Sequence, residues 1–469
     1  MATEEMTHAP IADGSIAELA QALRGQLITR GDPGYDEART IWNGAHDRRP
    51  ALIVRCAGVA DVMRAVEFAR SEELVVSVRG GSHSIPGFST NDGGIVIDLS
   101  PMKGISVDPQ AGRAVAQTGL KWSEFDHETQ AFGLATTGGL VSSTGIAGFT
   151  LGGGVGWLMR KHGLAADNLV GADIVTADGR LVHASADENP ELLWGLRGGG
   201  GNFGIATAFE YDLHRVGPMV TAGAVFYPGD RAAEILRFYR DWAEDAPDEL
   251  TTLANLLTAP PAPFIPEAWH GKPLVALIGM HCGSIEDGER AVRPLRELGE
   301  PVADLMGPLP YVAMQGLVDP LWGPGAHSYM KAGFMGSLDD AAIDTLVSYH
   351  QSSVSPKSEI HVQHMGGAVA RVPAAATAFG DRSAPFLLNV IASTFTADGY
   401  DEAVAWAQAL HRAMTPSLTG ASYINFLSAE GDDRVRAAYG ANYDRLVALK
   451  DEYDPTNLFR LNQNIRPSA

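Results

Sequence analysis

Three clusters of glycine constrain the fold of this chain more than any other feature of its sequence. They lie at residues 80–94, 138–156 and 195–204, all in the first half of the 469 residues, and they flank apolar or β-branched segments. Clustered glycines indicate tight turns, or places where the backbone closely approaches a ligand. In segment 137–157, glycines alternate with apolar residues, serines and threonines. That pattern favours a buried backbone lying against a flat ring over a flexible linker.

The first cluster has the form of an anion-binding turn. A β-branched segment, 75–78, runs into Arg79, Gly80, Gly81 and Ser82. Consecutive glycines let successive backbone N–H groups point to one side, and Arg79 adds positive charge. Pyrophosphate is therefore the expected ligand. The pattern is neither a Walker loop nor a Rossmann fingerprint. His83 follows directly, and by itself it is more typical of a histidine that caps its own turn; its neighbourhood favours a role in the site.

The distribution of strands and helices divides the chain near residues 213–217. The first part alternates short strands and helices, whereas the second carries longer strands between amphipathic helices, which predicts an α+β domain on an antiparallel sheet. In the first part we expect helices at 21–27, 59–71 and 121–131, and strands at 51–56, 74–79, 94–99, 104–108, 113–117, 170–177 and 180–184. In the second part we expect strands at 220–226, 274–281, 328–335, 359–364 and 386–393, and helices at 231–242, 285–298, 339–352 and 400–414.

Composition excludes several classes of function. The formal net charge of −21 and the pI of about 5.0 disfavour binding to nucleic acids or to anionic membranes. We expect no metal site and no segment that spans a membrane. Residues 1–10 lack the apolar stretch of a secretory signal, and Cys56 and Cys282 sit in apolar runs typical of buried thiols. A cytoplasmic protein is the expectation.

Four motifs together resemble a known family. They are Arg79–Ser84 with Gly87, residues 145–168, residues 194–204 and residues 453–465. In this order the chain resembles the berberine-bridge-enzyme-like flavoproteins, FAD-linked oxidases of the vanillyl-alcohol-oxidase superfamily with a PCMH-type FAD-binding domain. The resemblance implies a two-part FAD-binding domain, made of residues 1–215 and of a C-terminal segment, 421–469, that returns to it. Residues 216–420 are then an inserted substrate domain.

The resemblance also implies roles for particular residues. His83 is expected to carry a single covalent link to FAD, because Val141 stands where doubly linked members have a second, cysteinyl attachment. Phe426 stands where plant members have a tyrosine base, and their glutamate base has no evident match after Gly367. The residues implied to bind the cofactor are Arg79, Gly80, Gly81, Ser82, His83, Ser84, Gly87, Val141, Thr144, Gly145, Gly148, Gly153, Gly154, Trp157, Gly204, Ile205, Tyr423, Asn425, Asn462 and Asn464.

These features predict an FAD-dependent oxidase that removes hydride from a C–H beside oxygen or nitrogen and reduces O₂ to H₂O₂. Alcohols, sugars, phenolics and alkaloids are the candidate substrates. The alternatives are a dehydrogenase with another electron acceptor, a flavin- or ligand-binding protein without turnover, and an NADPH-dependent reductase with noncovalent flavin, against which His83 argues. Tyr329, Lys331 and His364, on the strands expected at 328–335 and 359–364, are the candidate bases. Aromatic residues such as Trp322, Phe334 and Tyr311 either line a pocket or belong to the core.

Overall fold

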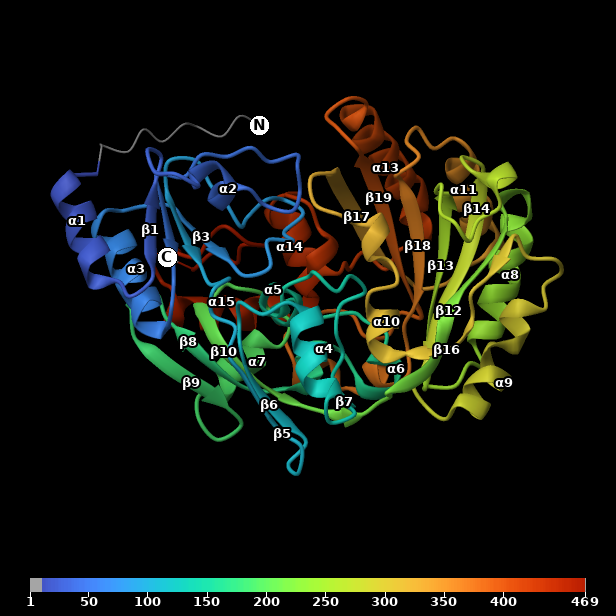
Figure 1. Cartoon of the computed structure of the whole chain (residues 1–469), viewed down its shortest axis with the longest axis horizontal. Coiled ribbons are helices and arrows are strands. Elements are labelled where there is room, and N and C mark those ends of the chain that lie inside the picture. The colour runs from blue at the N-terminus through green and yellow to red at the C-terminus, as the bar shows by residue number, and fades with distance from the viewer. Residues whose placement is uncertain (1–10, 469) are drawn as a thin grey trace.

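The computed structural model describes residues 11–468 and consists of two halves that face each other (Figure 1). One half contains sheets of four, five and two strands and both ends of the described chain, and the other contains one large sheet. The expectation about a secretory signal concerns residues 1–10, which lie outside the described residues. None of the helices in the described range is long and apolar enough to cross a membrane.

A four-stranded sheet positions the first glycine cluster. Its order is β1-β2-β4-β3, with β2 and β3 both parallel to β4. Parallel strands are buried on both faces, which explains their continuous apolar runs. The turn at residues 80–84 leaves β3 at its carboxyl end. The elements are α1 (Asp13–Ala22), β1 (Gln26–Thr29), α2 (Tyr35–Arg39), β2 (Leu52–Arg55), α3 (Val59–Ser71), β3 (Val76–Arg79) and β4 (Ile95–Asp98).

The prediction of a helix at 21–27 is wrong. Helix α1 ends at Ala22, and Gln26 already begins strand β1, which pairs with β2. Pairing of Leu27 and Ile28 with the apolar strand β2 gives this segment partners that its local helical pattern could not reveal.

The second sheet of this half is antiparallel and has the order β5-β6-β10-β8-β9. Its core includes Trp122, Phe125 and Tyr211, whose rings meet edge to face or tilted. The elements of this sheet and the helices around it are β5 (Ile105–Asp108), β6 (Arg113–Gln117), α4 (Trp122–Gln130), α5 (Ile146–Leu151), α6 (Met159–His162), β8 (Leu169–Val175), β9 (Leu181–Ser185), α7 (Pro190–Leu196) and β10 (Ile205–Asp212). Strands β7 (Leu134–Ala135) and β11 (His214–Arg215) pair with each other in a separate two-stranded sheet.

The C-terminal segment packs into the core of the second sheet. Helices α14 (Asp432–Tyr439) and α15 (Tyr443–Tyr453), drawn in red, lie among the elements of the N-terminal half (Figure 1). The Lys450 ammonium is fully buried, and it donates to Asp454 Oδ2 at 2.7 Å and to the carbonyl oxygens of Asn202 and Phe459. A buried charge is tolerated when it is paired and hydrogen-bonded, so this pair fastens the tail beside the third glycine cluster.

The other half is built on one antiparallel sheet with the order β15-β12-β14-β13-β18-β19-β17, to which β16 adds beside β12. Strand β13 was not expected from the sequence, yet it occupies the centre of the sheet. The elements are β12 (Met219–Pro228), α8 (Ala232–Ala243), β13 (Leu250–Thr258), β14 (Pro273–His281), α9 (Ile285–Arg296), β15 (Ala303–Asp304), β16 (Gly307–Pro310), α10 (Tyr311–Gln315), β17 (His327–Met335), α11 (Asp340–Gln351), β18 (Glu359–His364), α12 (Ala368–Arg371), β19 (Phe386–Thr394) and α13 (Tyr400–Met414).

The two faces of this large sheet have different partners. Alternate residues such as Val225, Leu277 and Val362 pack under helices α8, α9, α11 and α13 on the outer face. The residues between them, among them Phe226 and Ile278, point toward the first half of the molecule. Both faces are therefore buried, and the inner one forms a wall of the cavity described next.

Candidate active site

A cavity of about 430 Å³ lies between the glycine turns of the first half and the inner face of the large sheet. The turns at residues 80–85 and 139–149 line it on one side, and strands β12, β13, β14, β17, β18 and β19 line it on the other. The C-terminal segment contributes residues 423–427 and 459–463. Residues from all four motifs therefore meet at one site, together with residues of the large sheet.

The turn at residues 80–84 keeps its backbone N–H groups free. Among the described residues, the N–H groups of residues 81–84 donate to no protein atom, and Ser82 has a left-handed backbone with φ of 62°. The turn lies directly against residue 145: a methyl group on Gly81 would come within 2.2 Å of the Gly145 nitrogen. Unpaired N–H groups on such a turn form the concave anion site that a pyrophosphate occupies.

Replacing Gly81 with alanine is expected to push these two backbone segments apart. We expect a loss of about 1–3 kcal/mol in unfolding free energy, because overpacking displaces backbone that cannot relax, together with poor flavin content. Thermal unfolding and the ratio of flavin to protein absorbance measure the two effects. Gly307→Ala is the matched control, because a methyl group there meets nothing within 4 Å. Equal behaviour of the two variants would contradict the role of this contact.

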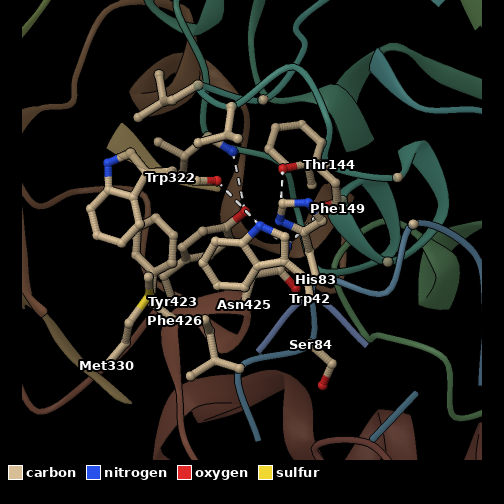
Figure 2. A pocket seen from close by; sticks show the side chains of 18 of the residues that line it. Trp42, His83, Ser84, Thr144, Phe149, Trp322, Met330, Tyr423, Asn425 and Phe426 are labelled. Carbon is tan, nitrogen blue, oxygen red and sulfur yellow. Dashed lines mark hydrogen bonds between the residues drawn. The ribbon is translucent and has the colours of Figure 1, made fainter. Parts of the chain in front are cut away.

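His83 is held in one orientation at the edge of the cavity. Its ring stacks on Trp42 at 4.8 Å, its Nε2 lies 3.0 Å from the Ser143 hydroxyl, and its Nδ1 lies 3.5 Å from the Thr144 hydroxyl (Figure 2). Removal from bulk water, with a smaller repulsion from Lys121, lowers the pKa of His83 to about 3. The imidazole is therefore neutral near pH 7 and keeps a nucleophilic lone pair.

The site fits a large flat cofactor with phosphates. Methyl groups on Gly148 or Gly201 would meet no protein atom within 4 Å, and both residues line the cavity. The indole N–H of Trp157 and the side-chain oxygen of Asn462, also at the cavity, are buried without a hydrogen-bond partner in the described structure. Open space beside glycine backbone and unpaired polar atoms are what a bound ring system and its side chain would use.

Most residues implied by the resemblance line this cavity. They are Gly80, Gly81, Ser82, His83, Ser84, Val141, Thr144, Gly145, Gly148, Trp157, Gly204, Ile205, Tyr423, Asn425 and Asn462. Tyr423 acts through its oxygen, which accepts hydrogen bonds from the N–H groups of Gly154 and Val155 and from Asn425 Nδ2. Burial raises the pKa of Tyr423 to about 12, so its phenol stays protonated and orders the second glycine cluster.

Five implied cofactor residues are not among those that line the cavity: Arg79, Gly87, Gly153, Gly154 and Asn464. The Arg79 guanidinium is buried and donates to the carbonyl oxygens of Ala38, Arg39 and Ser89 instead of reaching the cavity. The three glycines have positive φ, and a methyl group on any of them would meet a neighbouring side chain at 2.4–2.5 Å. The structure therefore gives these positions a role in packing the turns.

The three candidate bases lie away from the cavity. Tyr329 and Lys331 sit on the outer face of β17, where Tyr329 packs against the core under the helices and Lys331 pairs with Glu430 at 2.6 Å. His364 accepts a hydrogen bond from Arg160 Nη1 at 2.9 Å, and burial and the Arg160 charge lower its pKa to about 3. Strand alternation turns these three side chains to the face opposite the cavity, so the structure does not bring them together with the cofactor site.

On the wall that the large sheet forms, the titratable residues that line the cavity are Glu359 and His361, both on strand β18. Glu359 Oε2 lies 2.8 Å from His361 Nε2 and accepts a hydrogen bond from Asn255 Nδ2 at 2.9 Å. His361 Nδ1 makes no hydrogen bond to any described residue. Glu359, His361 and Gln363 lie on one face of the strand, as strand alternation predicts. The sequence did not indicate that this face is the one that lines the cavity.

Of the aromatic residues that were candidates for a pocket wall, only some reach it. Trp322 and Phe426 line the cavity beside Met330 (Figure 2). Trp322 stacks on Trp42 at 6.5 Å and meets His361 edge-on at 6.4 Å. Tyr311 and Phe334 are buried in separate hydrophobic cores. The wall near His83 is thus made of aromatic rings that continue to the Glu359–His361 pair.

Comparison with known proteins identifies the family. One family model, described as an FAD binding domain, matches residues 50–185, and another, described as berberine and berberine like, matches residues 422–466. The chain is 33% identical to (R)-6-hydroxynicotine oxidase of Paenarthrobacter nicotinovorans, over 96% of this chain and 98% of that enzyme. The chain belongs to the berberine-bridge-enzyme-like FAD-linked oxidoreductases.

This FAD-linked oxidoreductase matches solved structures along nearly its whole length. Against 6-hydroxy-D-nicotine oxidase from Arthrobacter nicotinovorans the TM-score is 0.86 at 30% identity, covering 95% of this chain and 98% of that one. Against the carbohydrate oxidase from Microdochium nivale it is 0.85 at 25% identity, covering 97% and 100%. These matches confirm the expected α+β fold of the PCMH type. The FAD binding family model and the relative of 33% identity show that the chain is an FAD-linked oxidoreductase.

Proposed function

We propose that this enzyme is an oxidase that removes hydride from a C–H beside the oxygen or nitrogen of a small organic substrate and passes the electrons to O₂. Residues 1–215 and 421–469 would bind FAD, residues 216–420 would bind the substrate, and His83 would carry the single covalent link. When bound, FAD supplies the hydride acceptor. The neutral imidazole of His83, beside the glycine turns, supports the proposal of the link.

The observation that carries the proposal is the Glu359–His361 pair on the cavity wall. Loss of a hydride from a C–H beside an O–H gives a neutral carbonyl when the O–H also gives up its proton, so a base in the site assists the reaction. Because His361 Nε2 is engaged with Glu359, the Nδ1 lone pair is available to accept that proton. The carboxylate fixes the tautomer of the ring and stabilises the cation that forms, as in other histidine–carboxylate pairs.

The names of the relatives support an oxidase without fixing its substrate. One is an oxidase of a hydroxynicotine, and another, 27% identical over 97% of this chain and 95% of the relative, is the xylooligosaccharide oxidase of Thermothelomyces thermophilus. The substrate wall of the cavity belongs to the large sheet, whereas the flavin motifs belong to the first half. Different members can therefore keep one cofactor site and change what they oxidise.

Oxygen consumption tests the proposal directly. A panel of alcohols, amines, phenols and sugars is screened for bleaching of the flavin absorbance under anaerobic conditions, and each substrate found is then mixed with air. We expect one H₂O₂ for each substrate oxidised and recolouring of the flavin within the turnover time. Slow recolouring in air, with fast turnover only when an artificial electron acceptor is added, would identify a dehydrogenase. Absence of bleaching by the entire panel would count against turnover.

A further inference from the structure

The inner face of the large sheet is divided into a polar and an apolar part. The polar part lies on β18 and its two neighbours and consists of Asn255, Glu359, His361, Gln363 and Asn389. Within it, both side-chain polar atoms of Gln363 and the amide oxygens of Asn255 and Asn389 are buried without a hydrogen-bond partner in the described structure. Buried groups of this kind cost free energy unless a ligand satisfies them.

The apolar part occupies the strands on one side of the polar part. The registered row from His361 runs through Asn255 on β13 and Ala276 on β14 to Phe226 on β12. The next row runs from Gln363 through three apolar residues, which are Leu253, Ile278 and Ala224. Since neighbouring strands lie about 4.8 Å apart, Phe226 lies roughly 14 Å from His361, and the apolar residues of β13, β14 and β12 cover about 10 Å of that span.

The far end of the apolar part opens to the outside. Phe264, from the proline-rich segment 259–266, packs on Phe226 at 5.7 Å and lines the cavity while 40% exposed. Leu305 also lines the cavity and is 39% exposed. Large apolar side chains that are exposed and border a cavity indicate the path of an apolar ligand.

His83 lies on the other side of the polar part. Its ring stacks on Trp42, Trp42 stacks on Trp322, and Trp322 meets the edge of His361. The order along the cavity is therefore the histidine of the cofactor site, the Glu359–His361 pair, the apolar surface and the mouth at Phe264. A substrate whose reacting end lies at the pair must extend over the apolar surface.

We infer that the substrate is amphipathic: one oxidisable polar end lies against Glu359, His361 and Gln363, and an apolar body about 10–14 Å long reaches toward Phe264. This inference rests on the proposed function and names its substrate class. An oligosaccharide fits poorly, because its outer hydroxyl groups would be buried against Phe226, Ala276 and Ile278 without partners. The two exposed residues at the mouth, Phe264 and Leu305, then select for the apolar end.

Binding of a homologous series tests the inference without requiring turnover. The 4-n-alkylphenols from phenol to 4-octylphenol are titrated into the flavin-loaded enzyme, and equilibrium dialysis gives each dissociation constant. We expect affinity to rise about fourfold for each added methylene that contacts the apolar surface, and to level off when the chain reaches the mouth. Xylobiose, tested in the same way, is expected not to saturate. Equal affinity across the alkylphenols, or tighter binding of xylobiose, would overturn the inference.

Variants at the mouth of the cavity test whether the alkyl chain of the ligand contacts Phe264 and Leu305. Phe264→Ala is expected to weaken 4-octylphenol about tenfold and to leave phenol unchanged, and Leu305→Ala serves as a second variant if the first does not fold. Phe132→Ala is the matched control, because Phe132 is 48% exposed and is not among the residues that line the cavity. An equal loss in the control would overturn the assignment. Binding that depends on chain length, without H₂O₂ production, would support the inference and contradict the oxidase proposal. Turnover of sugars alone, with H₂O₂ production, would support the oxidase proposal and overturn the inference.

Discussion

Replacing His83 with alanine is expected to release the flavin completely from the acid-denatured chain, whereas the parent enzyme stays yellow under the same treatment. The imidazole of His83 is neutral near pH 7, held by Trp42, Ser143 and Thr144, and open to the cavity, so it is the nucleophile placed for a covalent link. Precipitation with acid, followed by the absorbance of pellet and supernatant near 450 nm, measures the effect, and the mass of the intact chain confirms it.

A second histidine beside the same turn is the control for this experiment. His46 lies next to Gly87, with its Nε2 2.8 Å from the Ile85 carbonyl oxygen, but it is not among the residues that line the cavity. His46→Ala perturbs the turn without removing the imidazole of His83, and it is expected to retain flavin after acid. Flavin released from the parent enzyme would show a noncovalent cofactor. Flavin retained by the His83 variant would place the link on another side chain.

Replacing Glu359 with glutamine is expected to slow flavin reduction by about 10²–10⁴-fold, the usual range for loss of a positioned proton acceptor. Glutamine keeps the shape of the side chain but cannot stabilise a protonated His361, whose Nε2 lies 2.8 Å from the carboxylate. His361→Asn removes the acceptor itself and is expected to slow the reaction by a similar factor. Stopped-flow measurement of flavin bleaching under anaerobic conditions reports this step without interference from oxygen.

The residues chosen from the sequence provide matched controls for that experiment. Tyr329→Phe and Lys331→Met change ionisable groups on the same sheet, but on its outer face, so the reduction rate is expected to stay within about twofold of the parent. A large loss of rate in Tyr329→Phe or Lys331→Met, with none in Glu359→Gln, would contradict the assignment of the pair.

The glycine pattern and the motifs determined the cofactor half of the molecule. A turn after Arg79 that contains Gly80 and Gly81 carries little side-chain bulk, so a turn at the edge of the cavity, with His83 beside it, could be expected from local chemistry. The positive charge expected from Arg79 at this turn does not reach the cavity. Its guanidinium donates hydrogen bonds to the carbonyl oxygens of residues 38, 39 and 89. Only the folded chain brings these oxygens near Arg79.

In the half that contains the large sheet, the sequence did not predict which side chains line the cavity. Alternation along β18 determined that Glu359, His361 and Gln363 share one face and His364 the other, but it could not determine which face meets the cavity. In most antiparallel sheets the polar face is the solvated one, whereas every residue of β18 and β19 is buried here, with helices on one side and the cofactor half on the other. The sequence by itself determined the cofactor and the fold. The tertiary structure decided which face of β18 lines the cavity. Both faces of this strand are buried, so the packing of the two halves against each other, and not a local preference, determines which side chains reach the cavity.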